Sequence, residues 1–319
     1  MAQATPSPPL SCGVYVASLT FFKPGNEQLD LDILEKHIAR LARRGAAGIV
    51  ALSSNGEAAH LSSLERHQVV STIRKALDKH AHPGMPLIVG ASAPSVAGTI
   101  RLCQEATDAG GDYVLVLPPS YYKTAMSDEA IFQFYKAVSA ASPLPLIIYN
   151  YPDVAASINM DSDLIIRTSQ QCSNVVGCKF TCGDTGKLLR VARAMNAKRP
   201  GHDGSGYWCA GGLADFLLQA LVVGASGAIA GGANITPKTC VEVFRLFCEG
   251  RLEEASYAQG ILAQGDWIHT RAGIGATKAV LQAAFGYGGL PRLPLTGVSE
   301  ATRANMMAVF DPAEKPIQR

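Results

Sequence analysis

The chain has 319 residues, of which 48% are hydrophobic and 17% are charged. This composition is typical of a globular protein with a large buried core, and it excludes a disordered or fibrous chain. Lys and Arg number 28 against 26 Asp and Glu, and the resulting net charge of +2 argues against nucleic acid or an acidic membrane surface as a partner.

Short apolar runs alternate with segments of helical period along most of the chain. The runs that predict buried strands are residues 13–22, 48–54, 86–92, 113–118, 144–151, 175–180 and 227–230. The segments that predict helices are residues 32–44, 62–79, 95–109, 127–141, 161–170, 186–196, 215–223 and 237–249. The spacing of these units places an eighth strand at residues 199–205, although this segment is poor in β-forming residue types.

Eight successive strand–helix units predict an α/β fold of the (β/α)8 TIM barrel type. The alternative is an open, doubly wound sheet, but no predicted strand is followed by the Gly-x-Gly-x-x-Gly loop of such folds. We predict an N-terminal tail at residues 1–12, the barrel at 13–250 and a C-terminal helical extension at 251–319. Within the extension, residues 253–268, 277–286 and 301–310 each have the pattern of a helix.

The N-terminal residues carry no positively charged region and no apolar stretch of signal-peptide length, which predicts a cytoplasmic protein. The longest apolar runs end well before the ~18 residues that a membrane helix needs, so no membrane partner is expected. The eight cysteines are interpreted as reduced thiols, because disulfide frameworks belong to much smaller secreted chains.

Polar residues stand at the ends of several predicted strands, where a barrel places its active site. Lys179 lies in the apolar strand at residues 175–180. Removal of an ammonium group from water lowers the pKa of a lysine, and the neutral amine is a nucleophile toward carbonyl groups. The alternative is a lysine that extends to solvent at the barrel mouth or pairs with a carboxylate such as Glu57.

Tyr149, at the end of the preceding strand, carries a phenol that can exchange protons with a carbinolamine, although a lone tyrosine there also suits packing. The hydroxyl of Ser54 can tune this phenol. Backbone N–H groups at Ser54 and Asn55, in the turn that Gly56 permits, can hold a substrate carboxylate. Tyr122, after the fourth strand, is by itself a weak candidate.

Two further motifs allow both functional and structural interpretations. Cys178 and Cys182 flank the lysine, but strand alternation turns Cys178 away from Lys179, so we expect packing rather than redox or metal chemistry. Gly231 begins a Gly-Gly-Ala-Asn stretch that suits either a phosphate or a turn. The seven histidines include no His-x-x-x-His pair, and no metal site is predicted.

Four motifs occur in order: SNGE at residues 54–57, YYK at 121–123, IIYNYP at 147–152 and GCKFTCGD at 177–184. Together they resemble the dihydrodipicolinate synthase / N-acetylneuraminate lyase family of Schiff-base class I aldolases, over almost the whole chain. The resemblance implies that Lys179 forms an imine with pyruvate or another 2-oxo acid, and that Tyr149 is the proton shuttle. It also implies that Ser54 and Asn55 bind the keto-acid carboxylate and relay protons. No cofactor beyond this covalent imine is expected.

Other positions take roles from the same resemblance. Tyr122 stands where a tyrosine reaches a neighbouring subunit's site, and Thr181 stands where a hydroxyl is directed at the substrate. The small residues that begin at Gly231 leave room for the keto acid. The resemblance further implies a homotetramer.

Two departures from the family pattern narrow the subfamily. The synthases usually have Thr-Thr-Gly-Glu in place of Ser-Asn-Gly-Glu, and an arginine for a second carboxylate in place of Val154. A valine cannot bind that carboxylate, so dihydrodipicolinate synthesis is disfavoured. The motifs look more like those of 4-hydroxy-2-oxoglutarate aldolases and of fungal aldolases that split 2-keto-3-deoxy sugar acids, such as L-threo-3-deoxy-hexulosonate.

These observations predict a carbon–carbon lyase that cleaves a 2-keto-3-deoxy acid to pyruvate and an aldehyde, and the missing arginine favours an uncharged aldehyde. A metal-dependent class II aldolase, a hydratase or dehydratase, and a barrel that binds a ligand without catalysis are the alternatives.

Overall fold

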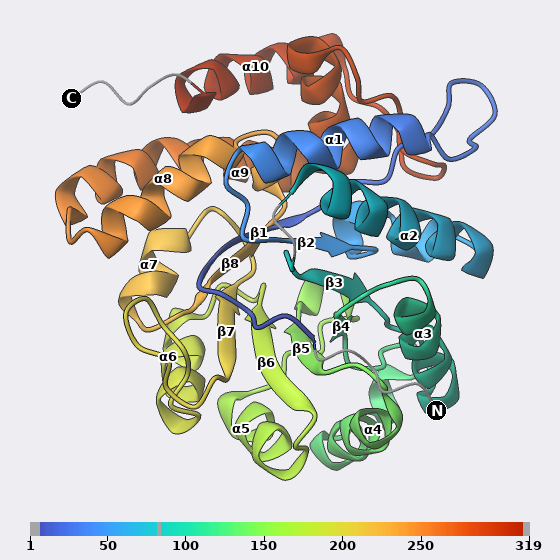
Figure 1. The fold of residues 1–319 in the computed structure, drawn as a ribbon, viewed down its shortest axis with the longest axis vertical. Helices are drawn as coiled ribbons and strands as arrows, with labels where there is room; N and C mark the ends of the chain where they lie inside the picture. The colour runs from blue at the N-terminus through green and yellow to red at the C-terminus, as the bar shows by residue number, and fades with distance from the viewer. Residues whose placement is uncertain (1–6, 82–83, 315–319) are drawn as a thin grey trace.

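The structure is a computed structural model that describes residues 7–81 and 84–314. Eight parallel strands form a closed barrel in chain order, in which β1 pairs with both β2 and β8 (Figure 1). The strands are β1 (Gly13–Ala17), β2 (Gly48–Ala51), β3 (Leu87–Gly90), β4 (Tyr113–Val116), β5 (Leu146–Asn150), β6 (Val175–Phe180), β7 (Trp208–Gly211) and β8 (Gly227–Ala230). The predicted (β/α)8 barrel is confirmed, and the open sheet is excluded.

Each strand is followed by a helix on the outside of the barrel (Figure 1). These helices are α1 (Leu31–Arg43), α2 (Ser63–His80), α3 (Val96–Asp108), α4 (Asp128–Ala141), α5 (Ser162–Gln171), α6 (Thr185–Ala194), α7 (Leu217–Val222) and α8 (Pro237–Cys248). Several begin after a polar residue that caps the first turn. Ser62, for example, accepts a hydrogen bond from the backbone N–H of Glu65, whose own carboxylate accepts the N–H of Ser62.

The predicted strand at residues 199–205 is wrong, because β7 begins at Trp208, three residues after the end of the predicted segment. Residues 199–205 form an exposed turn in which Gly201 and Gly204 have positive φ values of 76° and 56°. This left-handed backbone does not fit a strand. Residues 208–211 are all buried, and Trp208 fills the barrel interior beside Tyr15, with ring centroids 4.9 Å apart.

The first two helices predicted in the extension are parts of one long helix, α9 (Leu252–Phe285). Its axis is kinked at Gly273, where the backbone is non-helical with φ of 73° and ψ of −164°. The third is α10 (Glu300–Glu314), which packs on α9 and lies at the outer edge of the molecule, drawn red in Figure 1. The predicted tail at 1–12 and extension at 251–319 also contain residues 1–6 and 315–319, which lie outside the described residues.

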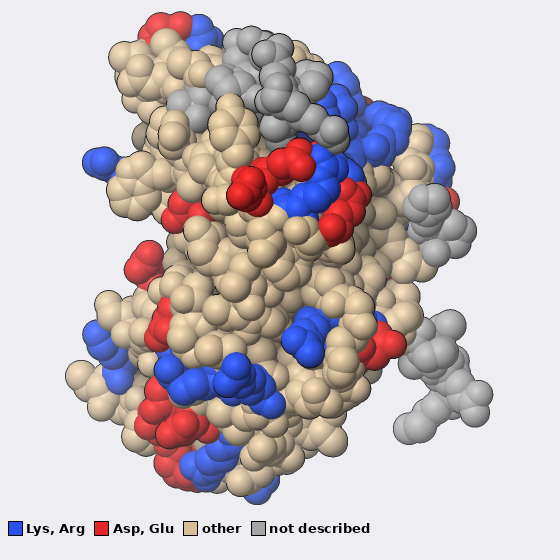
Figure 2. All heavy atoms as spheres, turned by 90° about the vertical axis from the view of Figure 1, so that its left-hand side faces the viewer, with Lys and Arg blue, Asp and Glu red and all other residues tan. Residues whose placement is uncertain are grey.

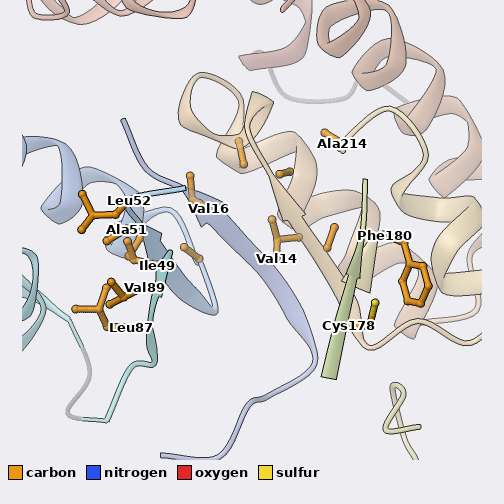
Figure 3. Close-up of a cluster of buried hydrophobic side chains, with 14 of the residues drawn as sticks. Val14, Val16, Ile49, Ala51, Leu52, Leu87, Val89, Cys178, Phe180 and Ala214 are labelled. Atoms are coloured by element: carbon orange, nitrogen blue, oxygen red, sulfur yellow. The ribbon is translucent and has the colours of Figure 1, made fainter. Parts of the chain in front are cut away.

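Strand alternation separates the core into an inner and an outer layer. Cys178 and Phe180 belong to the outer layer between strands and helices, and Figure 3 shows both on the same side of their strand. The inner layer contains Tyr149 and Trp208. Lys179, between Cys178 and Phe180, therefore faces the barrel interior.

On the face shown in Figure 2, acidic and basic side chains lie in small mixed groups with uncharged surface between them. Within residues 7–81 and 84–314, none of the helices has the length and apolar character needed to span a membrane.

Candidate active site

The centre of the candidate site is a lysine–tyrosine pair on adjacent strands. Lys179 on β6 is aligned in register with Tyr149 on β5. Both side chains are buried, with 2% and 3% of their surface exposed. The Nζ atom of Lys179 lies 4.1 Å from the centroid of the Tyr149 ring. The strand register thus holds an amine against the face of a phenol inside the barrel.

The phenol of Tyr149 also contacts Ser54, the first residue of the 3-10 turn η1 (Ser54–Gly56) that follows β2. The two hydroxyl oxygens are 3.4 Å apart. Burial raises the pKa of Tyr149, but the positive charge of Lys179 and the hydrogen bond with Ser54 outweigh it, so the pKa lies below its usual value of 10. A phenol in this state gives up its proton more readily than a free tyrosine does.

The turn that carries Ser54, Asn55 and Gly56 is held from two sides. The hydroxyl of Thr20 donates a hydrogen bond to the carbonyl of Gly56, at 2.7 Å. On the other side, a methyl group added to Gly231, after β8, would overlap Nδ2 of Asn55. The structure therefore brings Ser54, Asn55, Gly56 and Gly231 together, as the sequence analysis grouped them.

Thr181 follows Lys179 at the end of β6, two residues later and thus on the same side of the chain. Its side chain is buried, at 7% exposure, and its Oγ1 finds no hydrogen-bond partner among the described residues. Buried hydroxyl groups are rarely left unsatisfied, so such a group calls for a bound molecule or an ordered water.

The ion pair between Lys179 and Glu57, which was the alternative to a reactive lysine, is not present, because Glu57 has another partner. Its carboxylate instead binds Lys278 of α9, with Oε1 and Nζ 2.7 Å apart and both side chains 0% exposed. Its other oxygen accepts the backbone N–H of Arg292 at 2.8 Å. Lys278 is not predictable from the sequence as a buried group, because a lysine in a helix is normally exposed to solvent.

A cavity of about 340 Å³ opens beside Tyr149. Lys179, Asn55, Gly56, Thr181 and Gly231 are not among the residues that line it. Ser54 and Tyr149 line it, together with Val154 from the turn η4 (Pro152–Val154) and Leu295 from the extension. Tyr122 does not line this cavity: it is 68% exposed and stacks edge-to-face on Tyr121, with ring centroids 5.0 Å apart. A single chain therefore does not bring Tyr122 to the other candidate residues.

Arg66 also lines the cavity, and its guanidinium group donates hydrogen bonds to the backbone carbonyls of Gly90 and Ala58. All eight cysteines are free thiols. In the part of the chain that the structure describes, no three His, Cys, Asp or Glu side chains are placed to hold a metal ion together.

The fold and the candidate site define the class of this protein as a TIM barrel, with a buried lysine–tyrosine pair toward the carboxyl ends of its strands. A model of the dihydrodipicolinate synthetase family matches residues 11–312, and the chain belongs to this family.

Curated relatives include an L-threo-3-deoxy-hexylosonate aldolase of Hypocrea jecorina, 49% identical, with the match covering 92% of this chain and 93% of the relative. A second of that name, from Aspergillus niger, is 46% identical, with 92% of each chain covered. A "Probable 4-hydroxy-2-oxoglutarate aldolase, mitochondrial" of Emericella nidulans is 45% identical, covering 95% of this chain and 94% of the relative.

Among solved structures, a dihydrodipicolinate synthase family protein of Coccidioides immitis matches with a TM-score of 0.84 and 33% identity, covering 96% of this chain and 97% of the other. Together these relatives make the chain a lyase of the aldolase type.

Proposed function

We propose that this enzyme is a class I aldolase that cleaves a 2-keto-3-deoxy acid to pyruvate and an aldehyde through an imine on Lys179. The observation that carries the proposal is the buried amine of Lys179, held 4.1 Å from the ring centroid of Tyr149. Two relatives at 46–49% identity are named as aldolases of a 3-deoxy sugar acid, which supports this substrate class.

In the proposed reaction, Nζ of Lys179 attacks C2 of the keto acid. The resulting carbinolamine loses its hydroxyl as water, with a proton from the phenol of Tyr149. The product is a protonated imine, which is a stronger electron sink than the ketone. The phenolate of Tyr149 then takes the proton of the C4 hydroxyl while the C3–C4 bond breaks. The electron pair of that bond moves toward the imine to give an enamine, and the aldehyde departs.

The protonated Tyr149 next returns its proton to C3 of the enamine. Water hydrolyses the protonated pyruvate imine, which releases pyruvate and the free amine of Lys179, and the proton set free returns to the phenolate of Tyr149. Ser54, 3.4 Å from the phenol oxygen, relays protons between Tyr149 and the cavity. Asn55 and the N–H groups of its turn bind the substrate carboxylate, and the unpartnered hydroxyl of Thr181 contacts the substrate. Positioning of reacting groups can lower the activation free energy by ~7–11 kcal/mol. The proposal therefore includes no metal or organic cofactor.

Borohydride trapping tests the imine. Incubation with pyruvate and borohydride should add one reduced pyruvate adduct per chain, detected by intact mass and located on Lys179 by peptide mapping. Lys179→Ala should stay unmodified, whereas Lys136→Ala, which removes an exposed lysine on α4, should be trapped like the wild type. Equal trapping of Lys179→Ala would show that another amine reacts. A metal-dependent class II mechanism would instead make turnover sensitive to EDTA.

Val154 favours a sugar acid over a dicarboxylate. It lines the cavity with Leu295, so an apolar side chain stands where the synthases usually carry an arginine. A panel of 2-keto-3-deoxy acids, assayed by coupled detection of pyruvate, identifies the substrate. Val154→Arg should reduce turnover of sugar acids, and unaltered kinetics would remove this side chain from the pocket.

The second candidate function is cleavage of 4-hydroxy-2-oxoglutarate, because Arg66 lines the same cavity as Tyr149 and supplies a cation near it. The engagement of Arg66 with two backbone carbonyls argues for the sugar acid. Preferential turnover of the dicarboxylate by the wild type, lost in Arg66→Gln, would reverse this assignment.

We also propose a homotetramer in the cytoplasm. The exposed aromatic pair Tyr121 and Tyr122 suits a subunit interface, and the eight free cysteines suit a reducing compartment. Light scattering after size exclusion tests the tetramer. Imaging of a fluorescent fusion tests the compartment, since two relatives carry mitochondrial names.

A further inference from the structure

A buried histidine of the extension lies beside Asn55. His269 is on α9, four residues before the kink at Gly273, and only 6% of its surface is exposed. A methyl group on Gly231 would overlap Nδ2 of Asn55 and would lie 2.8 Å from Nε2 of His269. Both nitrogens are therefore within 2.8 Å of one point above Gly231, at 2.0 and 2.8 Å, so they are at most 4.8 Å apart and both border the space above this glycine.

The other ring nitrogen of His269 is held by Thr277, which lies beyond the kink. The distance between Nδ1 and Oγ1 of Thr277 is 2.5 Å. The same hydroxyl donates a hydrogen bond to the carbonyl of Gly273 at 3.3 Å. A threonine hydroxyl has one proton, so it accepts from Nδ1–H of the histidine. In the neutral ring, the lone pair is then on Nε2, which can accept a hydrogen bond.

The charge state of the ring agrees with this tautomer. Burial lowers the pKa of His269, and the negative charge of Asp266 opposes the change without cancelling it. Gly231 has φ of −74° and ψ of −42°, which any residue can adopt, so the close approach of Asn55 and His269 is what requires glycine here. The glycine thus keeps open the space in which the amide and the imidazole meet.

We propose that His269 is a positioning residue that orients the amide of Asn55, so that an N–H group rather than the carbonyl oxygen faces the carboxylate of the bound 2-oxo acid. An asparagine amide has two N–H protons and can use one for Nε2 of His269 and the other for the carboxylate. A flipped amide would place an oxygen against the anion. This inference rests on the proposed function, because it assigns Asn55 to the substrate carboxylate.

The test measures the pyruvate concentration that gives half-maximal borohydride trapping. We expect His269→Leu to raise this concentration about tenfold, because hydrogen bonds to charged groups are among the stronger ones, while trapping at saturating pyruvate is unchanged. His269→Gln keeps an acceptor near the position of Nε2 and should stay within about twofold of the wild type. His202→Leu, the matched control at an exposed histidine, should match the wild type.

A double-mutant cycle separates positioning from a general effect on folding. In the Asn55→Ala background, His269→Leu should produce no further rise, since the amide that it orients is gone. Thr277→Val keeps the imidazole in place but frees its tautomer, and should raise the half-maximal concentration a few-fold. This second variant also serves if His269→Leu does not fold.

Three outcomes would overturn the inference. The first is an unchanged half-maximal pyruvate concentration in both His269→Leu and Thr277→Val, and the second is an equal rise of this concentration in His269→Gln and His269→Leu. The third is a rise caused by His269→Leu in the Asn55→Ala background that is as large as the rise in the wild type. Trapping in the wild type combined with any of these leaves the proposed function intact. Absence of trapping in the wild type would instead overturn the proposed function, and this inference with it.

Discussion

The buried ion pair between Glu57 and Lys278 gives a sharp prediction about stability. Both side chains are fully buried, and Oε1 and Nζ are 2.7 Å apart. Lys278→Met would leave the carboxylate of Glu57 with the N–H of Arg292 and the ring of His60 as its remaining partners. Removal of one member of a buried pair typically costs about 3–5 kcal/mol, because the other charge stays buried without compensation.

The double variant Glu57→Gln with Lys278→Met contains no lone charge. We expect it to lose less than half as much stability as Lys278→Met, since a buried ion pair often contributes little over neutral residues of similar size. At about 2 °C per kcal/mol for a chain of this length, Lys278→Met should lower Tm by roughly 6–10 °C. Lys136→Met, at an exposed position on α4, is the control and should leave Tm unchanged.

Thermal unfolding followed by circular dichroism measures these shifts, and urea unfolding gives the free energies at 25 °C. A loss below about 1 kcal/mol in Lys278→Met would show that Glu57 takes up a proton or gains water at little cost. A double variant less stable than Lys278→Met would also refute the reasoning, because it would mean that the charges themselves are not the source of the loss.

Three more predictions concern single groups. Gly231→Ala should weaken pyruvate trapping at least tenfold, because the added methyl group would overlap Nδ2 of Asn55. Its Tm should change little, because the backbone angles of Gly231 are helical, and normal trapping would contradict this prediction. Burial lowers the pKa of His37 to about 3 from its ordinary 6.5, so between these values the folded state binds fewer protons than the unfolded state. The contribution of His37 to stability should be full above pH 6.5 and fall as the pH drops toward 3. Urea unfolding measured across this range should show a flatter pH profile in His37→Gln. The phenol of Tyr149, followed by ultraviolet difference absorbance against Tyr149→Phe, should titrate below pH 10 in the wild type. It should titrate at a higher pH in Lys179→Met, where the charge is gone and only the serine hydrogen bonds still oppose burial; equal midpoints would deny the effect of the charge.

The barrel was predictable because seven of its strands are apolar runs bounded by turns and cap residues. The prediction of β7 was wrong because a long polar turn precedes its four residues. The regular spacing of the other units pointed to that turn instead of to residues 208–211. Trp208 was the available signal, since a large apolar side chain rarely stands in an exposed loop. In the extension, the glycines between residues 269 and 276 interrupt the helical pattern, although the structure departs from helical geometry only at Gly273.

Lys179 and Tyr149 could be placed together from sequence because both lie on adjacent strands of a closed sheet, and a parallel register brings their side chains to the same height. No such rule connects Glu57 with Lys278, which are 221 residues apart. A local pattern contains no information about which turn a distant helix will cover. His269 was missed for the same reason.

The extension holds the turns of the candidate site from outside the barrel. Lys278 binds Glu57 in the turn after β2, and Asp266 accepts the N–H of Asp215 in the segment after β7. After β8, Asn234 is bonded to His37, which in turn contacts Tyr287 of the extension.

Strand register therefore places the groups proposed to react, whereas the extension fixes the turns proposed to bind the substrate. Because the two sets come from different parts of the chain, substitutions in α9 are expected to act on substrate binding, and substitutions in β5 or β6 on the chemical steps.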